Sequence, residues 1–549
     1  MATTRKNKRF LLFLLLITSL LLIVGCSDES NESNAEKGGK DEAENAAPQS
    51  GGAIRVGVSE EPDTLDIHKT AMGITSQISS HLGGALLTMN PETREIEPHL
   101  AESYTVSEDG KTLTFKIRQD VVMQDGTAIT ATVFKETFDR ILNPETGAAT
   151  VASMLGGVQS VSAPDDETLV IQLEAPSAPL LQNLADASFL QPLSMAAIEE
   201  AGDDYGRNPV GVGPWKFNEW VTGQSISLVR NEGYKWPETH HENQGKAYPD
   251  SLEYKFIGDN QTLLAALDSG SIDIAYEVTA RDAKRYRERK GFHVVEADMQ
   301  GLGLFMQMNL ENEILADVNV RKAINMAINK ESIIDAVLDG EGTPAYGPLA
   351  SSIFGYDPNV EEYGHKFNAE EAIELLESSG WEQNGDGVRE KDGQELKFEL
   401  STMEDYNQSA QIAQAMLKEI GIEVSIQAWD AGTLIENVSQ GDFELSFLTY
   451  AFPDPDILYL LFHSSQIGGL NHVRVNDPEL DALLEKGRIT LDADERKQVY
   501  ADIQEIVVEE AYWVPIYTNK LLHIVNDRVH NVSIVDSTMV LHDSWVTPE

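Results

Sequence analysis

Strand-like and helix-like segments alternate along almost the whole of this 549-residue chain. The strand candidates are short runs rich in β-branched and aromatic residues, and several alternate between apolar and polar side chains. They are residues 113–118, 168–173, 225–229, 252–257, 272–278, 304–309, 396–401, 422–429 and 443–450. Helix candidates lie between many of them. Mixed alternation over a length well above one domain predicts two or three α/β domains.

One of the helices is indicated by the residues at its two ends. Asn368 precedes the amphipathic segment 369–379, Glu371 follows the asparagine by three residues, and Gly380 comes just after the end. An N-terminal capping box and a C-terminal glycine are typical of a complete helix. We therefore predict a helix over 369–379.

The first 26 residues have the pattern of a lipoprotein signal. Basic residues lie among the first nine, an apolar run begins at Phe10, and Gly25 precedes Cys26, the only cysteine in the chain. We expect residues 1–25 to be removed and Cys26 to carry at least two acyl chains, which give stable anchoring. The protein would then face the outside of the cell, anchored to the membrane. A plain secretory signal and an uncleaved transmembrane anchor are the alternatives, although the run is shorter than the ~20 residues that span a bilayer.

The residues after Cys26 contain no large apolar side chain as far as Ser50. Such a composition cannot bury a core, so we predict a disordered tether over 26–51 and a folded body that begins with a strand at 53–59. A single cysteine allows no internal disulfide. The stability of the body must therefore come from a large apolar core, which a chain of this length can build.

The chain is strongly acidic, with 41 basic and 90 acidic residues and a formal net charge of −49. Loss of four basic residues with the signal leaves 37 basic residues and a charge of −53. Like charges repel, so nucleic acid and anionic lipid surfaces are disfavoured as partners. The excess charge also suits an extracellular protein in a saline or alkaline medium.

Sequence signals of catalysis are absent. The chain has no G-x-S-x-G, H-E-x-x-H or Walker A motif. His240, His241 and Glu242 are adjacent, and adjacent side chains do not converge on a metal without special loop geometry, so exposed loop histidines are the favoured interpretation. Residues 382–393 resemble part of a calcium loop but end in Gly393 where a bidentate glutamate is needed, which favours a polar turn. We expect no enzymatic activity, no cofactor and no metal.

Five segments, in order along the chain, carry a family resemblance. They are 100–118 with 125–127, N-P-V-G-V-G-P-W-K-F at 208–217 with 230–231, 317–330, P-D-P-D at 453–456, and V-P-I-Y at 514–517. Together they resemble the solute-binding receptors of oligopeptide- and dipeptide-type ABC importers, the bacterial extracellular solute-binding proteins of family 5. The resemblance covers the chain from about residue 52 to the end.

The resemblance implies a two-lobed α/β fold of the periplasmic-binding-protein type (type II, or Venus flytrap) with an extra domain inserted in lobe one. The expected bounds are 52–88, 204–305 and 514–549 for lobe one, 89–203 for the inserted domain and 306–513 for lobe two. Ligand that contacts both lobes only in the closed state would drive closure. The implied partners are an ABC permease with its ATPase, and we expect a monomer.

The cargo that the resemblance favours is an oligopeptide. In peptide-binding relatives an aspartate just before the Pro-Asp-Pro pairs with the free ammonium of the ligand, whereas this chain has Ala451 there. A buried ammonium without a partner costs several kcal/mol. Asp454 or Asp456 could replace the missing charge, and an oligosaccharide is the alternative cargo.

By resemblance, ligand-binding residues are expected from both lobes. These are Met72, Gly73, Trp429, Tyr450, Ala451, Phe452, Asp454, Asn471 and Tyr517. Any one of the aromatic residues among them is also suited to a core position. Two other functional classes of protein remain as alternatives: an extracellular hydrolase and a signalling or chaperone-like surface protein.

Overall fold

The computed structural model describes residues 47–547 of the chain. The residues from Pro48 onward form one compact unit. The expected signal peptide, Cys26 and most of the expected tether lie outside the described residues. Within residues 47–547, every helix is too short or too polar to cross a membrane.

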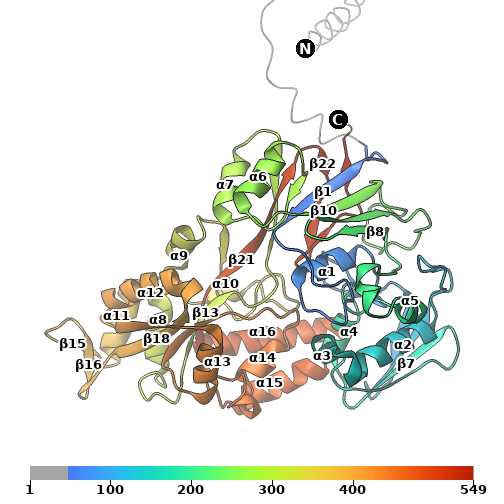
Figure 1. Cartoon of the computed structure of the whole chain (residues 1–549). Helices are drawn as coiled ribbons and strands as arrows, with labels where there is room; N and C mark the ends of the chain where they lie inside the picture. Colours follow the sequence, from blue (N-terminus) through green and yellow to red (C-terminus); the bar gives the residue numbers. More distant parts are fainter. Residues whose placement is uncertain (1–46, 548–549) are drawn as a thin grey trace, which may run out of the picture. The chain divides into compact units, whose positions relative to one another are not determined.

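A mixed sheet of twelve strands runs through this unit, and one long strand lies in its middle (Figure 1). This strand is β21 (Trp513–Asn526). Residues 513–517 of β21 pair with β13 (Leu304–Met308), whereas residues 520–526 pair with β12 (Phe292–Asp298). A single strand therefore joins two halves of the sheet. We call the half that contains β12 lobe one and the half that contains β13 lobe two.

Lobe two has helices on both faces of its strands. The strands are β13, β18 (Lys397–Met403), β19 (Glu423–Trp429) and β20 (Leu445–Leu448). The core on one face includes the helices α8 (Val318–Ala327), α9 (Lys330–Val337), α11 (Ala369–Ser378) and α12 (Asn407–Glu419). The core on the other face includes the helices α13 (Ala431–Gln440), α14 (Ile457–Phe462), α15 (Pro478–Ile489) and α16 (Ala493–Glu509). Successive side chains of a strand point to opposite faces, so Met306 packs in the first core and Phe305 in the second.

Lobe one holds the N-terminal strand between two later segments of the chain. Its strands are β1 (Ala53–Val58), β8 (Trp215–Val221), β9 (Ser225–Arg230), β10 (Ser251–Phe256), β11 (Ile274–Ala275) and β12, and its helices are α1 (Gly73–Ser80), α6 (Asn260–Asp268) and α7 (Ala280–Arg287). β1 pairs in parallel with both β10 and β11. The buried Asp273 carboxylate accepts hydrogen bonds from the backbone and guanidinium of Arg55 and pairs with Arg528, so three distant segments are held together.

A separate four-stranded antiparallel sheet comes from the chain between β1 and β8. Its strands are β4 (Ala101–Val106), β5 (Thr112–Ile117), β6 (Val158–Ser162) and β7 (Thr168–Leu173), and the neighbouring helices are α2 (Ala131–Leu142), α3 (Ala149–Met154), α4 (Ala178–Asn183) and α5 (Met195–Ala201). Phe134 and Phe138 of α2 are fully buried in the same core as Phe115 of β5. We call residues 101–201 the inserted region. The domain bounds expected from the sequence stay predictions.

Short elements complete the described part of the chain. They are β2 (Leu87–Met89), β3 (Ile96–Pro98), β14 (Gly342–Pro344), α10 (Val360–Tyr363), β15 (Glu382–Gln383), β16 (Arg389–Lys391), β17 (Gln394–Glu395), β22 (Val529–His530), β23 (Ser533–Val535), β24 (Thr538–Val540) and β25 (Trp545–Val546). The 382–393 stretch forms the β15–β16 hairpin, in which the Asn384 side chain accepts hydrogen bonds from the backbone of Asp386 and Val388.

Candidate ligand-binding cavity

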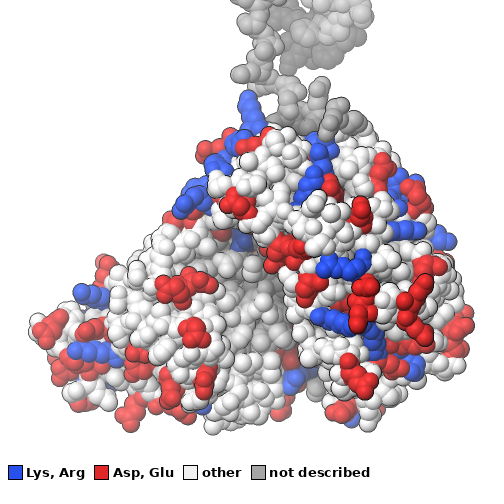
Figure 2. Space-filling view, viewed as in Figure 1, with Lys and Arg blue, Asp and Glu red and all other residues white. Residues whose placement is uncertain are grey.

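A cavity of about 610 Å³ lies where lobe one, the inserted region and lobe two meet. Lobe one contributes α1, the loop between β9 and β10, residues 276–277 and the β23–β24 hairpin. The inserted region contributes Met154, Gln182, Asn183 and residues 185–189. On the lobe-two side the lining residues are 451–453, with residues 299–300 of the segment that leads into β13. Figure 2 shows the surface hollowed between the α11–α13 side and the α2–α5 side.

The two sides of this cavity differ in chemistry. We call the lining residues 299–300 and 451–453 the apolar wall, because all of them except Gln300 are apolar, namely Met299, Ala451, Phe452 and Pro453. We call the remaining lining residues the polar wall, because they include every acidic and histidine side chain that lines the cavity, although apolar residues such as Phe189, Trp215 and Leu521 are also among them. Its acidic and histidine members are Asp186, Glu238, Glu277, Asp536, His81, His99, His240, His241 and His542. Neither lysine nor arginine is among the described residues that line the cavity.

Two carboxylates of the polar wall come from distant segments. Asp186 follows α4, and its side chain accepts hydrogen bonds from the backbone N–H groups of Ser188 and Phe189 at 2.7 and 2.9 Å. Asp536 lies at the tip of the β23–β24 hairpin and pairs with Arg94 at 2.7 Å. Burial raises the pKa of the Asp186 carboxyl above its ordinary value, and the negative charge of Asp536 adds to the rise. Asp186 therefore has backbone N–H groups as its partners, whereas Asp536 has the basic partner Arg94.

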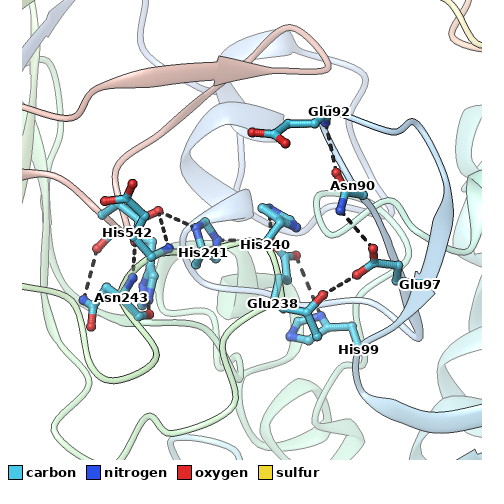
Figure 3. A network of polar contacts seen from close by, with 12 residues as sticks. Asn90, Glu92, Glu97, His99, Glu238, His240, His241, Asn243 and His542 are labelled. Atoms are coloured by element: carbon cyan, nitrogen blue, oxygen red, sulfur yellow. Dashed lines mark hydrogen bonds and ion pairs between the residues drawn. The ribbon is translucent and has the colours of Figure 1, made fainter.

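A second group of polar side chains surrounds Glu238 (Figure 3). Its carboxylate lies 3.2 Å from Nε2 of His241 and 3.4 Å from Nε2 of His240. The other ring nitrogen of His241 lies 2.9 Å from the Asp543 carboxylate. Burial lowers the pKa of His241, but its hydrogen bonds to Asp543 and Glu238 outweigh burial and raise that pKa to about 9.

A third part of the polar wall lies beside β21. Burial raises the pKa of the Glu277 carboxyl, and the backbone N–H of Glu277 donates to Nδ1 of His523 at 3.0 Å. The His523 ring stacks on Tyr276 with 4.5 Å between the ring centroids. Because Nδ1 accepts a hydrogen bond and the ring is buried, His523 is neutral at pH 7, and burial lowers its pKa to about 4.

The apolar wall is fixed to the lobe junction by backbone contacts. Leu302 donates its N–H to the Tyr450 carbonyl at 2.8 Å. Gly301 has a φ of +136°, and a Cβ on it would lie 2.6 Å from the same carbonyl oxygen. Only glycine allows this close approach of the two segments. The inserted region reaches the same wall, because the Gln182 side chain donates to the Pro453 carbonyl at 2.8 Å.

Some of the residues predicted from the sequence line the cavity. Gly73, Ala451 and Phe452 are lining residues. Met72 directly precedes α1, and its sulfur accepts a hydrogen bond from the backbone of Asp63 at 3.4 Å.

The other predicted residues have internal partners. Asp454 is 1% exposed and forms two hydrogen bonds with Arg496, at 2.7 and 2.9 Å. The Asn471 amide donates to the carbonyls of His463 and Val475. Trp429 and Tyr450 pack against the α13–α16 core, and Tyr517 is buried in the core that contains α8 and α12.

Several polar residues of the cavity carried no signal in the sequence. Asp186, Glu238 and Asp536 come from three segments far apart in the chain, and none belongs to a motif with fixed spacing. Only the chain fold brings them to one wall, so their grouping could not be inferred from local patterns.

The comparisons with known proteins agree with one another. The family model of the bacterial extracellular solute-binding proteins, family 5 middle, matches residues 95–469. The oligopeptide-binding protein AppA of Bacillus subtilis is 29% identical over 530 residues, which cover 93% of each chain. The glutathione-binding protein GsiB of Pectobacterium atrosepticum is 27% identical over 460 residues, which cover 80% of this chain and 84% of the relative.

Solved structures show the same likeness. The structure of AppA from Bacillus subtilis in complex with a nonapeptide is 26% identical, with a TM-score of 0.64, and covers 91% of this chain and 100% of that one. HbpA2 from Haemophilus parasuis, at 22% identity, has a TM-score of 0.81 and covers 90% of this chain and 100% of that one. These likenesses confirm the two-lobed α/β fold that the sequence predicted.

Proposed function

Because the chain belongs to the bacterial extracellular solute-binding proteins of family 5, we propose that it captures oligopeptides between its two lobes and delivers them to an ABC importer. The family model covers more than half of the chain. The peptide cargo is supported by the similarity to AppA, whose structure holds a nonapeptide. In this role the protein binds its cargo without changing it.

One observation carries the peptide proposal. The cavity is lined by four carboxylates and by neither lysine nor arginine among the described residues. A buried ammonium is stabilised only where carboxylates or other acceptors replace its water. Ala451 supplies no charge, so in this proposal the ammonium of a peptide binds at the polar wall, at Asp186 and beside the Asp536–Arg94 pair.

The delivery step follows from the division into lobes. A peptide in the cavity contacts both the polar wall and the apolar wall, and its binding energy favours the arrangement in which both contacts are made. The permease and its ATPase then need to recognise only the closed receptor. Acylation of Cys26 would anchor the protein to the outer surface of the cell membrane and keep it near the permease.

Native mass spectrometry tests this proposal directly. The full chain is purified in mild detergent from cells grown in rich medium, its intact mass is recorded, and bound molecules are identified after denaturation. A ladder of peptides bound at one per protein is the expected result. A series spaced by hexose units, or a protein that gains thermal stability with oligosaccharides and with no peptide, would overturn the peptide cargo while leaving the receptor class intact.

A further inference from the structure

The loop between β9 and β10, residues 231–250, brings three metal-ligating side chains together. The ligand atoms of Glu238, His240 and His241 all lie within 4.8 Å of one another. His99, which follows β3, adds a fourth group, because its Nδ1 lies 3.8 Å from Oε1 of Glu238. The sequence favoured separate exposed histidines here. The loop instead turns both histidines toward one carboxylate (Figure 3).

Two of the three distances from Glu238 suit an ion better than a direct hydrogen bond. Zinc ligands lie about 2.0–2.1 Å from the metal, so two ligands of a tetrahedral site are about 3.3 Å apart. The Glu238 carboxylate lies 3.2 Å from His241, 3.4 Å from His240 and 3.8 Å from His99. Two of these distances exceed the roughly 2.7–3.2 Å of an N–H···O hydrogen bond.

The outer contacts fix two of the rings in the orientation that a metal requires. Nε2 of His99 lies 3.0 Å from the Trp236 carbonyl, which can only accept, so this nitrogen donates and the Nδ1 lone pair faces Glu238. In the same way Nδ1 of His241 contacts the Asp543 carboxylate at 2.9 Å. Histidine ligands of metals almost always donate their second N–H to a carboxylate or a carbonyl.

A buried polar atom without a hydrogen bond also indicates a metal site. Nδ1 of His99 is buried and has no hydrogen-bond partner, and the His99 residue is 5% exposed. Its lone pair and the Glu238 carboxylate are both acceptors, and two facing acceptors repel each other unless a cation lies between them. We propose that Glu238, His240 and His241, with His99 as the fourth ligand, bind a divalent first-row transition ion of the zinc type.

The chemistry of the ligands selects the class of ion. Imidazole nitrogens with one carboxylate suit zinc, nickel and cobalt, whereas calcium and magnesium prefer oxygen ligands. The ion replaces the direct contact between Nε2 of His241 and Glu238, and Asp543 continues to hold the opposite side of the ring. All four ligands line the cavity, so the ion lies in the polar wall.

The test measures metal binding in the absence of any cargo. The full chain, purified without a histidine tag and treated with a chelator, is titrated with Zn²⁺ by calorimetry and with Co²⁺ by visible absorption. One ion per chain and the visible bands of tetrahedral Co²⁺ are expected. Glu238→Gln and His240→Gln should each weaken binding by more than Asp543→Asn, for which loss of an outer contact predicts about 10–100-fold.

His293→Gln is the matched control. The His293 side chain is 43% exposed on β12 and contacts a carboxylate, that of Asp527, at 3.1 Å, but it lies outside the Glu238 group. The control should bind the ion as tightly as the parent protein.

Three results would overturn the proposal. These are uptake at other than one ion per chain, equal affinity in the parent protein and Glu238→Gln, or an equal loss in His293→Gln. If Glu238→Gln does not fold, as judged by circular dichroism, the metal affinity of His240→Gln is compared with that of the parent protein instead. Because no peptide is present, failure of the peptide proposal would leave this result standing.

Discussion

The two walls of the cavity use acidic residues in opposite ways. On the polar wall, Asp186 lines the cavity and accepts hydrogen bonds from backbone N–H groups rather than from a basic side chain, and Asp536 lines the cavity beside Arg94. Behind the apolar wall, the Asp454 carboxylate points away from the cavity and is paired with Arg496 inside lobe two. The comparison suggests that the polar wall recognises charge on the cargo, whereas the acidic residue nearest the apolar wall supports the fold.

The largest expected effect tests whether Asp454, behind the apolar wall, stabilises the fold. Asp454→Ala leaves the buried Arg496 guanidinium without its carboxylate, and breaking a buried pair in this way costs about 3–5 kcal/mol. We expect the free energy of unfolding in urea to fall by this amount. Peptide affinity of the folded variant should not change.

A double variant provides the control for this first prediction. Replacing Asp454 and Arg496 together by leucine and methionine removes both charges and should restore most of the lost stability. If Asp454→Ala instead lost peptide affinity with little loss of stability, Asp454 would be a ligand contact, and the two walls would not differ as argued above.

The second effect tests, through pH, His523, which lies behind the polar wall and contacts the lining residues Tyr276 and Glu277. Burial lowers the pKa of His523 from 6.5 to about 4 in the folded protein. The unfolded chain therefore binds more protons between these values, so stability is complete above pH 6.5 and is lost as the pH falls toward 4, by about 3 kcal/mol. His523→Gln cannot titrate and should reduce the slope of this part of the stability curve, while the buried His81, His472 and His542, whose pKa values burial also lowers, keep the remaining slope.

The measurement is urea unfolding at several pH values between 4 and 7. Asn183→Ala changes no titratable group, so it serves as control and should keep the slope of the parent protein. An unchanged slope in His523→Gln would mean that the acid sensitivity does not arise beside β21.

Sequence patterns predicted a helix or strand well where the whole pattern lay within that one element. The helix expected at 369–379 is α11, and the Asn368 side chain accepts the N–H of Glu371 as the capping box requires. The strand expected at 168–173 is β7 with the same bounds. The strand expected at 272–278 is wrong over most of its length, because only Ile274–Ala275 pairs with neighbours while Asp273 is engaged with Arg55.

Non-local features were harder to predict. The return segment at 514–517 is only the start of β21, which continues to Asn526 and joins the lobes. Its second half pairs with β12, a strand more than 200 residues earlier in the chain, and no local pattern reveals such a partner. The cavity shows the same limit, since family resemblance led to Gly73, Ala451 and Phe452 but to none of the carboxylates of the polar wall.

The third effect tests whether the polar wall recognises an ammonium. Asp186→Asn and Asp536→Asn keep the size of each side chain but remove its charge. Hydrogen bonds to charged groups contribute about 1.5–3 kcal/mol, so each change should weaken binding of a peptide with a free N-terminus by roughly 10–100-fold in calorimetry.

Two controls make this prediction specific. An N-acetylated peptide has no ammonium, so its affinity should be the same for the parent protein and both variants. Asp203→Asn changes a fully exposed aspartate outside the cavity and should have no effect. Equal losses for free and acetylated peptides would show that the two carboxylates act on the shape of the wall rather than on the charge of the cargo.

The smallest effect concerns the single polar contact between the inserted region and the apolar wall. Gln182→Ala removes the hydrogen bond to the Pro453 carbonyl, and a neutral hydrogen bond contributes about 1 kcal/mol. A change of this size shifts a two-state equilibrium roughly 5-fold.

The adjacent Asn183 donates to Met154 within the inserted region, so Asn183→Ala also loses one hydrogen bond but none that reaches lobe two. Fluorescent labels on the inserted region and lobe two should therefore report a larger mean separation in Gln182→Ala than in Asn183→Ala. Equal separations would mean that the apolar wall is held by packing alone, which would sharpen its contrast with the hydrogen-bonded polar wall.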